Sequence, residues 1–347
     1  MEVPSAINRK TKVVVGICTF RRPAMLQRCI TSVMQQERPD DWQVEILVVD
    51  NDAQSDLGHT LDNVQSQNGY KLHYVIERNR GIPYARNAVC TYALQQKSDF
   101  VLFIDDDEEA APGWLMAYGR AASQFDAEAY TGPVRFIFPA GYEDWLANKG
   151  FSRTKHGALL QRASTGNVLF RTSILEKYEP PLSFDINMTM TGGSDTDFFM
   201  RLVQHGGKIV YVGDAEVSEA VVPVRLTIRW RLRRQYQSSA NRVYIESKLF
   251  GTKHVMATSL KQVFRHVLEG TLRLVFSPLL LLAGYTKFKR GWYHGLRHYA
   301  KAAGTLAGLR GSHVQLYLKT DGHRRDKLYR KCSFNPIDVQ CRALVKP

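Results

Sequence analysis

One stretch, residues 100–109, constrains the fold of this chain more than any other. Five apolar residues, Phe100 to Ile104, are followed at once by five acids, Asp105 to Glu109. The apolar part has the length of a buried strand. Carboxylates packed at its end repel one another unless they pair with cations or bind a metal such as Mg²⁺. A solvated acidic turn before a helix is the simpler alternative, and the run alone favours it.

Apolar runs typical of strands buried on both faces alternate with helical patterns in the first third of the chain. The strand patterns cover residues 12–18, 44–49, 72–76 and 100–104, and the helical patterns cover residues 24–36, 55–67 and 85–96. This alternation predicts an α/β fold with a Rossmann-like, mostly parallel, doubly wound sheet. Ligands of such sheets bind at the carboxyl ends of the strands, where Asp50 and Asp105–Asp107 are expected.

Charge divides the chain near residue 224. Residues 1–224 contain 22 Lys+Arg and 28 Asp+Glu (−6), whereas residues 225–347 contain 25 and 5 (+20), which together give the net +14. We therefore expect a self-contained domain over residues 1–224 and a basic helical extension over residues 225–347 that meets an anionic partner. Nucleic acid is not expected as that partner, because no nucleic-acid-binding motif is recognisable.

The basic extension mixes cations with aromatic residues, most densely in Tyr285–His294. This combination is typical of helices that lie on an anionic membrane surface; an ordinary helical cap packed on the first domain is the alternative. Its longest apolar run, Leu279–Ala283, widens only to the eleven residues 274–284. That is short of the roughly 20 residues of a spanning helix, and Pro278 is expected to break the helix there.

Two further features bear on the compartment. Five scattered cysteines without a C-x-x-C spacing indicate a reducing environment rather than a disulfide or zinc framework. Residues 1–12 are polar and contain no apolar stretch, so no signal peptide is expected.

A second acidic motif, Gly192–Asp197, precedes an apolar helical pattern. Ser194 is the expected N-cap, and Asp195 and Asp197 would lie in the first turn, where acids favour the helix dipole. Capping alone would explain these residues. The two glycines before them suggest a close approach of the backbone to a ligand, so a functional role for Asp195 is the alternative.

Together these segments resemble the inverting glycosyltransferases of family 2, which have the GT-A fold, and in particular the glucosyltransferases of succinoglycan-type exopolysaccharide assembly. The resemblance covers roughly residues 12–240 and rests on motifs that follow the family's order. These motifs are Gly16–Pro23, Val48–Asp52, Asn79–Asn87, Asp105–Asp107 and Gly192–Phe199. A single D-x-D sequence is a weak signal, but five ordered motifs are a strong one.

The resemblance implies roles for individual residues. The donor, a UDP-sugar, would be bound by Thr19, Arg21, Asp50, Arg86, Asp105 and Asp106. Asp105 and Asp107 would hold Mg²⁺ or Mn²⁺, which bridges the diphosphate and acts as a Lewis acid. We expect Glu108 and Glu109 to be only the exposed start of the next segment. Asp195 would be the general base that removes the proton of the acceptor hydroxyl.

Three positions depart from the family pattern. Ser194 stands where the family has Glu, and Ser218 where a His is common. Glu219, the next residue, is a candidate substitute for that His. Leu226 replaces the Gln of the Q-x-x-R-W motif of processive relatives, which favours transfer of one sugar over polymerisation.

The sequence thus predicts a metal-dependent, inverting transferase that moves a hexose, expected to be glucose, to a lipid-linked oligosaccharide or another glycan acceptor in bacterial surface-polysaccharide synthesis. It would be a peripheral protein at the cytoplasmic face of the inner membrane, or cytoplasmic. A catalytically silent sugar-nucleotide-binding scaffold of the same fold is the alternative. The retained Asp105, Asp107 and Asp195 argue against that scaffold.

Overall fold

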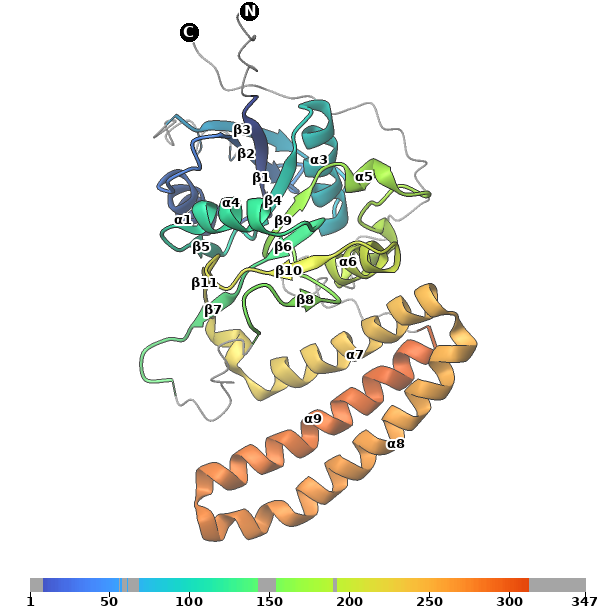
Figure 1. The fold of residues 1–347 in the computed structure, drawn as a ribbon. Helices are drawn as coiled ribbons and strands as arrows, with labels where there is room; N and C mark the ends of the chain where they lie inside the picture. Colours follow the sequence, from blue (N-terminus) through green and yellow to red (C-terminus); the bar gives the residue numbers. More distant parts are fainter. Residues whose placement is uncertain are drawn as a thin grey trace, which may run out of the picture.

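The computed structural model describes residues 9–55, 57, 61, 69–142, 154–189 and 192–311. These residues form an eight-stranded sheet flanked by helices, a small three-stranded sheet, and three long C-terminal helices that lie below the sheets in Figure 1. The helix predicted over residues 55–67 falls largely outside the described residues.

The strands contribute to two sheets. The large sheet contains β1 (Thr11–Thr19), β2 (Trp42–Asp50), β3 (Lys71–Ile76), β4 (Phe100–Ile104), β6 (Ala129–Thr131), β8 (Leu159–Leu160), β9 (Asn167–Arg171) and β10 (Ile209–Tyr211). The small sheet contains β5 (Glu108–Ala110), β7 (Val134–Ile137) and β11 (Val217–Ala220).

The helices cover both faces of the large sheet and form the C-terminal part. The α-helices are α1 (Pro23–Met34), α3 (Ile82–Gln95), α4 (Trp114–Gln124), α5 (Ile174–Lys177), α6 (Ser194–Gln204), α7 (Ile228–Phe250), α8 (Thr252–Phe276) and α9 (Tyr285–Leu309). The 3₁₀-helices are η1 (Ile186–Met188), η2 (Pro223–Leu226) and η3 (Ser277–Ala283).

The large sheet has the strand order β3-β2-β1-β4-β9-β6-β10-β8. β1 runs parallel to β2 and β4, and β2 runs parallel to β3, which confirms the predicted mostly parallel, α/β architecture. β9 runs antiparallel to both β4 and β6. The small sheet begins directly after the first three acids of the run, because β5 starts at Glu108.

Side chains of β1 alternate between two apolar cores, one on each face of the sheet. Val15 and Ile17 belong to a core that includes Ile30 of α1 and Trp114 of α4. Val14 belongs to the other core, with residues of α3 and α6. Burial on both faces explains why this strand shows no polar alternation in the sequence.

The basic extension folds into α7, α8 and α9, and α9 packs against both of the other helices (Figure 1). α7 connects this unit to the sheet domain. Asn241 Nδ2 donates to the carbonyl oxygen of Gly192 at 2.7 Å, and Lys248 Nζ lies 3.1 Å from Asp197 Oδ1. The predicted helical extension is therefore present and docked on the sheet domain.

The expectation that no helix is long and apolar enough to span a membrane was wrong. α8 passes into η3 without a turn, so that a single helical segment of 32 residues, Thr252–Ala283, meets that criterion by length and composition. Counting uninterrupted apolar residues missed it because a helix accommodates isolated charges such as Arg273 among apolar neighbours. Pro278 does not end the segment, because it lies in the first turn of η3, where its missing N–H leaves no bond unmade.

Two glycines of α9 allow its backbone to touch α7. A Cβ atom on Gly304 would lie 2.1 Å from the carbonyl oxygen of Tyr236, and one on Gly308 would lie 2.7 Å from that of Ala240. Contacts this short involve backbone atoms, which cannot move aside independently. α7 and α9 therefore meet at a distance that only glycine permits at these positions.

We expect Gly304→Val to destabilise the protein by about 1–3 kcal/mol, the usual cost of overpacking. Ala303→Val is the matched control, because Ala303 is exposed on the same helix and receives the same side chain. Urea unfolding of both variants measures the difference. Equal midpoints for the two variants would show that the contact between α7 and α9 is not close.

Candidate active site

The carboxyl ends of three neighbouring strands bring the predicted donor-site residues to one edge of the sheet. Thr19 ends β1 and pairs in register with Asp50, which ends β2. The acidic triplet follows β4, the other neighbour of β1. The Thr19 hydroxyl donates to Asp106 Oδ2 at 2.8 Å, which ties the end of β1 to the acidic run.

Two arginines lie among the acids. Arg22 Nη1 is 3.1 Å from Asp106 Oδ1 and 3.2 Å from Asp107 Oδ2. Arg225, on η2, approaches Asp107 Oδ2 at 3.2 Å and also pairs with Glu219. Sequence reasoning gave neither arginine a role at the site, although Arg22 lies within the quoted motif Gly16–Pro23. Arg225 could not be found from the sequence, because its partner Asp107 is 118 residues away.

The surroundings of Asp105 shift its pKa upward. Burial raises its pKa to about 7; nearby Arg86 opposes this shift, and Asp107, Asp106 and Asp195 add to it. Burial also raises the pKa of Asp106, against the effect of Arg22. The acids are therefore not a solvated turn, because burial is the first cause of both shifts.

Glu108 corrects another expectation. It was predicted, with Glu109, to be the exposed start of the next segment, and Glu109 is indeed exposed and paired with Arg28. Glu108 instead is only 3% exposed and pairs in register with Glu219 of β11. Burial, reinforced by Asp105, raises its pKa well above the usual range. The reason is tertiary: β5 starts at Glu108 and turns its side chain inward.

Arg86 connects the acidic run to the second acidic motif. It is 8% exposed on α3, and its Nη1 donates to the Ser194 hydroxyl at 2.9 Å. Ser194 is thus not the predicted N-cap: Gly193, at a left-handed φ of 89°, precedes the helix, and Ser194 is its first residue. The serine oxygen that would have capped the helix is engaged by Arg86.

The two aspartates of the first turn of α6 face different partners. Asp195 is partly exposed and acts electrostatically on Asp105. Asp197 is fully buried and pairs with Arg201 at 2.7 Å and with Lys248 of α7 at 3.1 Å. Asp195 therefore lies near the acidic run, and Asp197 fastens α6 to α7 of the extension.

Asp50 and Arg21 lie at the same edge with partners of their own. Asp50 is fully buried and accepts from the Tyr74 hydroxyl at 3.0 Å and from the backbone N–H of Asp52 at 3.0 Å. Arg21, at a left-handed φ of 55°, pairs with Asp52 at 2.5 Å. Their predicted roles toward a nucleotide remain predictions.

The side chains at this edge offer carboxylate oxygens, the ligand type that a hard divalent cation prefers. Asp105, Asp106, Asp107, Glu108 and Glu219 gather their carboxylates around the ends of β4 and β11. Burial and the neighbouring carboxylates both raise the pKa of Asp105, Glu108 and Glu219. A bound cation would offset the repulsion between these carboxylates. Oxygen-only ligands with room for water and phosphate are the coordination that Mg²⁺ and Mn²⁺ take.

The mostly parallel sheet with helices on both faces and the helical C-terminal part define the architecture of the GT-A fold. The solved structure of the mannosyltransferase PcManGT from Pyrobaculum calidifontis, in complex with GDP-Man and Mn²⁺, has this fold: the TM-score is 0.56 at 16% identity, over 86% of this chain and 87% of that one. At this identity the likeness concerns the fold.

The family follows from the sequence match. Residues 14–178 match the family model described as glycosyl transferase family 2, so the chain contains a family 2 glycosyltransferase domain and the protein is a glycosyltransferase. It is 27% identical over 269 residues to the succinoglycan biosynthesis protein ExoM of Rhizobium meliloti (strain 1021), covering 76% of this chain and 82% of that protein. It is 28% identical over 120 residues to a GalNAc(5)-diNAcBac-PP-undecaprenol beta-1,3-glucosyltransferase of Campylobacter jejuni, covering 34% and 37%.

We expect Asp105→Asn to stabilise the metal-free protein at pH 8. The pKa of Asp105 is 3.8 in the unfolded chain and about 7 in the folded protein. Between these pH values the unfolded chain releases the Asp105 proton while the folded protein keeps it, so the stability of wild type falls as the pH rises from 3.8 to about 7. The variant lacks this penalty, which amounts to a few kcal/mol because each pKa unit is worth about 1.4 kcal/mol. At pH 5 the gain should be much smaller.

Urea unfolding in chelator at both pH values measures this gain. Glu109→Gln is the control, because it removes a charge from the exposed part of the same run. A variant no more stable than wild type at pH 8 would show that Asp105 is not under electrostatic stress.

Proposed function

We propose that the protein is a metal-dependent, inverting hexosyltransferase that moves a hexose, most simply glucose, from a UDP-sugar to a lipid-linked oligosaccharide or another glycan acceptor. The observation that carries the proposal is the convergence of two acidic motifs 90 residues apart in the sequence. Asp195 lies close enough to Asp105 to raise its pKa. A candidate base therefore lies beside a candidate metal and diphosphate site.

The acids after β4 would hold the metal. Asp105 and Asp107 are the proposed protein ligands of Mg²⁺ or Mn²⁺, and the bound ion would offset the charge that develops on the leaving diphosphate. Arg22 and Arg225 already contact the Asp107 carboxylate, so they are placed to bind phosphate oxygens as well. The Mn²⁺ and GDP-Man of the PcManGT structure support the use of a metal and a sugar nucleotide.

Glu219 is the proposed substitute for the histidine that the family commonly has at position 218. Ser218 lies opposite Glu109 in the small sheet, whereas Glu219 pairs with Arg225. Burial raises the pKa of Glu219, and the nearby Asp107 carboxylate raises it further. A carboxylate oxygen here would serve a hard cation as well as an imidazole nitrogen does.

Asp195 would act as the general base. In the proposed step the acceptor hydroxyl oxygen attacks the anomeric carbon, its proton passes to the Asp195 carboxylate, and the bond to UDP breaks with the electron pair leaving on the diphosphate. One displacement inverts the anomeric centre. Arg86 would position Asp195, because its bond to Ser194 fixes the first residue of α6.

The relatives support a choice of donor and pathway. The names of the relatives refer to succinoglycan biosynthesis and to transfer of glucose to an undecaprenol-linked glycan, which supports glucose and a lipid-linked acceptor in exopolysaccharide synthesis. Thr19, Arg21 and Asp50 would line the nucleotide. Since Asp50 is fully buried, its proposed part is to hold Tyr74 and the turn at Asp52 in place.

The hairpin of α8, η3 and α9 would rest on an anionic membrane surface. Its tip, residues 275–285, exposes large apolar side chains, including Leu282 (93% exposed) and Tyr285 (64% exposed), at the end away from the sheet in Figure 1. Lys287, Lys289 and Arg290 follow directly. An apolar tip next to cations suits insertion among acyl chains beneath anionic headgroups, at the cytoplasmic face of the inner membrane.

We expect Asp195→Asn to lower turnover at least 100-fold while leaving metal-dependent donor binding intact, because general-base catalysis contributes about 10²–10⁴-fold. Asp107→Ala should instead weaken donor binding, because the variant loses the part of the donor affinity that the metal contributes. Calorimetric titration with UDP-glucose and Mn²⁺, together with UDP release in the presence of acceptor lipid, separates these effects. Unchanged turnover in Asp195→Asn would reject the base, and wild-type protein unable to release UDP at all would favour the silent scaffold.

We expect Phe276→Ser combined with Leu282→Ser to reduce binding to vesicles that contain anionic lipid, because two exposed apolar side chains of the tip are lost. Leu159→Ser is the matched control, since Leu159 is 63% exposed but lies on β8. Co-sedimentation across a salt series measures both. Equal binding by the double variant and the control would exclude the tip as the membrane contact.

A further inference from the structure

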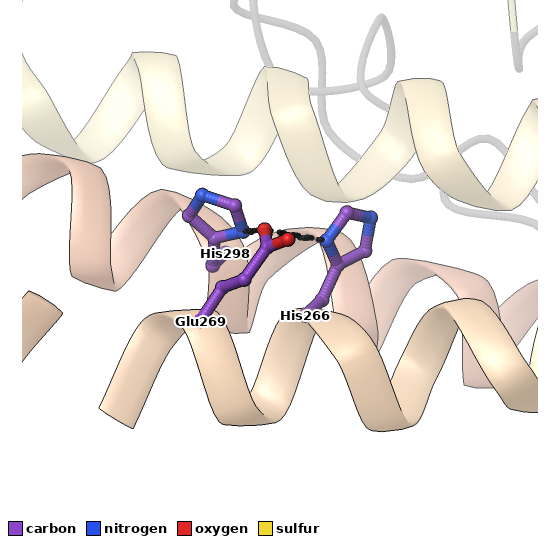
Figure 2. A group of neighbouring side chains, drawn as sticks. All are labelled: His266, Glu269 and His298. Carbon is purple, nitrogen blue, oxygen red and sulfur yellow. Dashed lines mark hydrogen bonds and ion pairs between the residues drawn. The ribbon is translucent and has the colours of Figure 1, made fainter. Parts of the chain in front are cut away.

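Three side chains with metal-ligand chemistry converge inside the C-terminal hairpin, outside the acidic site. His266 and Glu269 come from α8, and His298 comes from α9. Figure 2 shows the Glu269 carboxylate between the two imidazole rings, in the space between the two helices. His266 is buried, and the other two residues are partly buried.

The backbone geometry explains why these residues meet. His266 and Glu269 are three residues apart and therefore share a face of α8. The two helices come close at Gly270 and Gly295, where a Cβ atom added to Gly270 would lie 3.2 Å from the Gly295 carbonyl oxygen. His298 lies one turn beyond Gly295 on α9. The small residues thus set the separation at which the longer side chains converge.

The ligand atoms lie at distances suited to one ion. His298 Nδ1 is 3.3 Å from His266 Nδ1 and 3.0 Å from Glu269 Oε2, and His266 Nδ1 is 4.0 Å from the same oxygen. A tetrahedral ion with bonds of about 2.0–2.1 Å separates its ligand atoms by about 3.3 Å. Two of the three separations are near this value, and the third, between His266 and Glu269, is longer by under 1 Å.

Hydrogen bonding satisfies this group only in part. The Nδ1 atom of a neutral histidine has either one proton or one lone pair to offer. His298 Nδ1 faces both a carboxylate oxygen and a second ring nitrogen. If His298 Nδ1 carries the proton, one N–H faces two acceptors, the Glu269 oxygen and the His266 nitrogen, whereas a cation at the centre would be bound by a lone pair of each of the three atoms.

We propose that His266 Nδ1, His298 Nδ1 and Glu269 Oε2 bind a divalent transition-metal ion of the zinc class, which fastens α8 to α9. Two imidazoles and one carboxylate suit Zn²⁺, Co²⁺ or Ni²⁺ rather than Mg²⁺, and water completes the shell. The site differs in chemistry from the acidic site after β4, which offers oxygen ligands. The proposal is independent of the transferase assignment.

The local charges are consistent with a specific role for Glu269. Glu246 and Glu269 are the only acids in residues 225–311 of the sequence, and Glu269 is the one that lies at the contact between α8 and α9. Arg265 approaches its Oε1 atom at 3.8 Å, which leaves Oε2 facing the histidines. A carboxylate at this point of a basic hairpin would supply the negative charge that a cation requires.

The test uses full-length protein stripped of metal with chelator and titrated with Zn²⁺ in a calorimeter, and with Co²⁺ while the visible absorption is recorded. We expect saturable micromolar or tighter Zn²⁺ binding, a tetrahedral Co²⁺ spectrum and a higher unfolding temperature with Zn²⁺. His266→Gln, His298→Gln and Glu269→Gln should each weaken binding at least tenfold, because even the loss of an outer-shell partner costs 10–100-fold.

Two control variants locate the site. His294→Gln removes a partly buried histidine one turn before His298 on α9, and Asp107→Ala removes a proposed ligand of the acidic site; both should keep the Zn²⁺ affinity of wild type. Glu269→Gln keeps side-chain shape, so a normal helical circular-dichroism spectrum distinguishes ligand loss from misfolding. The proposal would be overturned if wild type did not bind Zn²⁺ at micromolar concentration. It would also be overturned if binding survived all three ligand variants, as it would if Cys332 and Cys341 were the ligands. In either case the three residues would be an interhelical hydrogen-bond cluster.

Discussion

The repulsion among carboxylates at the end of β4 is the constraint on which the rest of the site depends. Asp105 follows a fully buried strand, and its pKa is raised to about 7 by burial, with neighbouring acids adding to the shift. Arg22, Arg86 and Arg225 each come from a different element and lie among these acids. The fold thus holds in place a charge arrangement that a bound cation would complete, at some cost in stability.

Helix α6 links the chemistry to the extension. Its first turn places Asp195 toward the acidic run, while Asp197 pairs with Lys248 of α7. Arg86 fixes the same turn from the opposite side through Ser194. Movement of α7 on the sheet domain would therefore affect the proposed base, because α6 joins the unit proposed to lie on the membrane to Asp195.

The C-terminal unit combines close packing on its inner faces with apolar exposure at its tip. Glycines bring α9 against α7 and against α8, whereas the side chains of the tip, such as Leu282, remain largely exposed. A contiguous exposed apolar cluster of this kind marks an interaction site. Close backbone contacts therefore hold the helices of the C-terminal unit together, and its tip presents apolar side chains at the surface.

The sequence by itself determined the alternation of strands and helices, the position of Asp105–Asp107 at a strand end and the basic character of the extension, because these depend on local periodicity and composition. It misjudged Glu108 and Ser194, because burial and side-chain partners depend on what packs alongside. It misjudged the segment Thr252–Ala283 because a count of uninterrupted apolar residues passes over a helix that includes isolated charges and a proline in a first turn. Only the tertiary structure brought Arg225 to Asp107 and His298 to Glu269. Such pairings join residues distant in sequence, and the physical reason they form is strand register and helix contact, which no local pattern encodes.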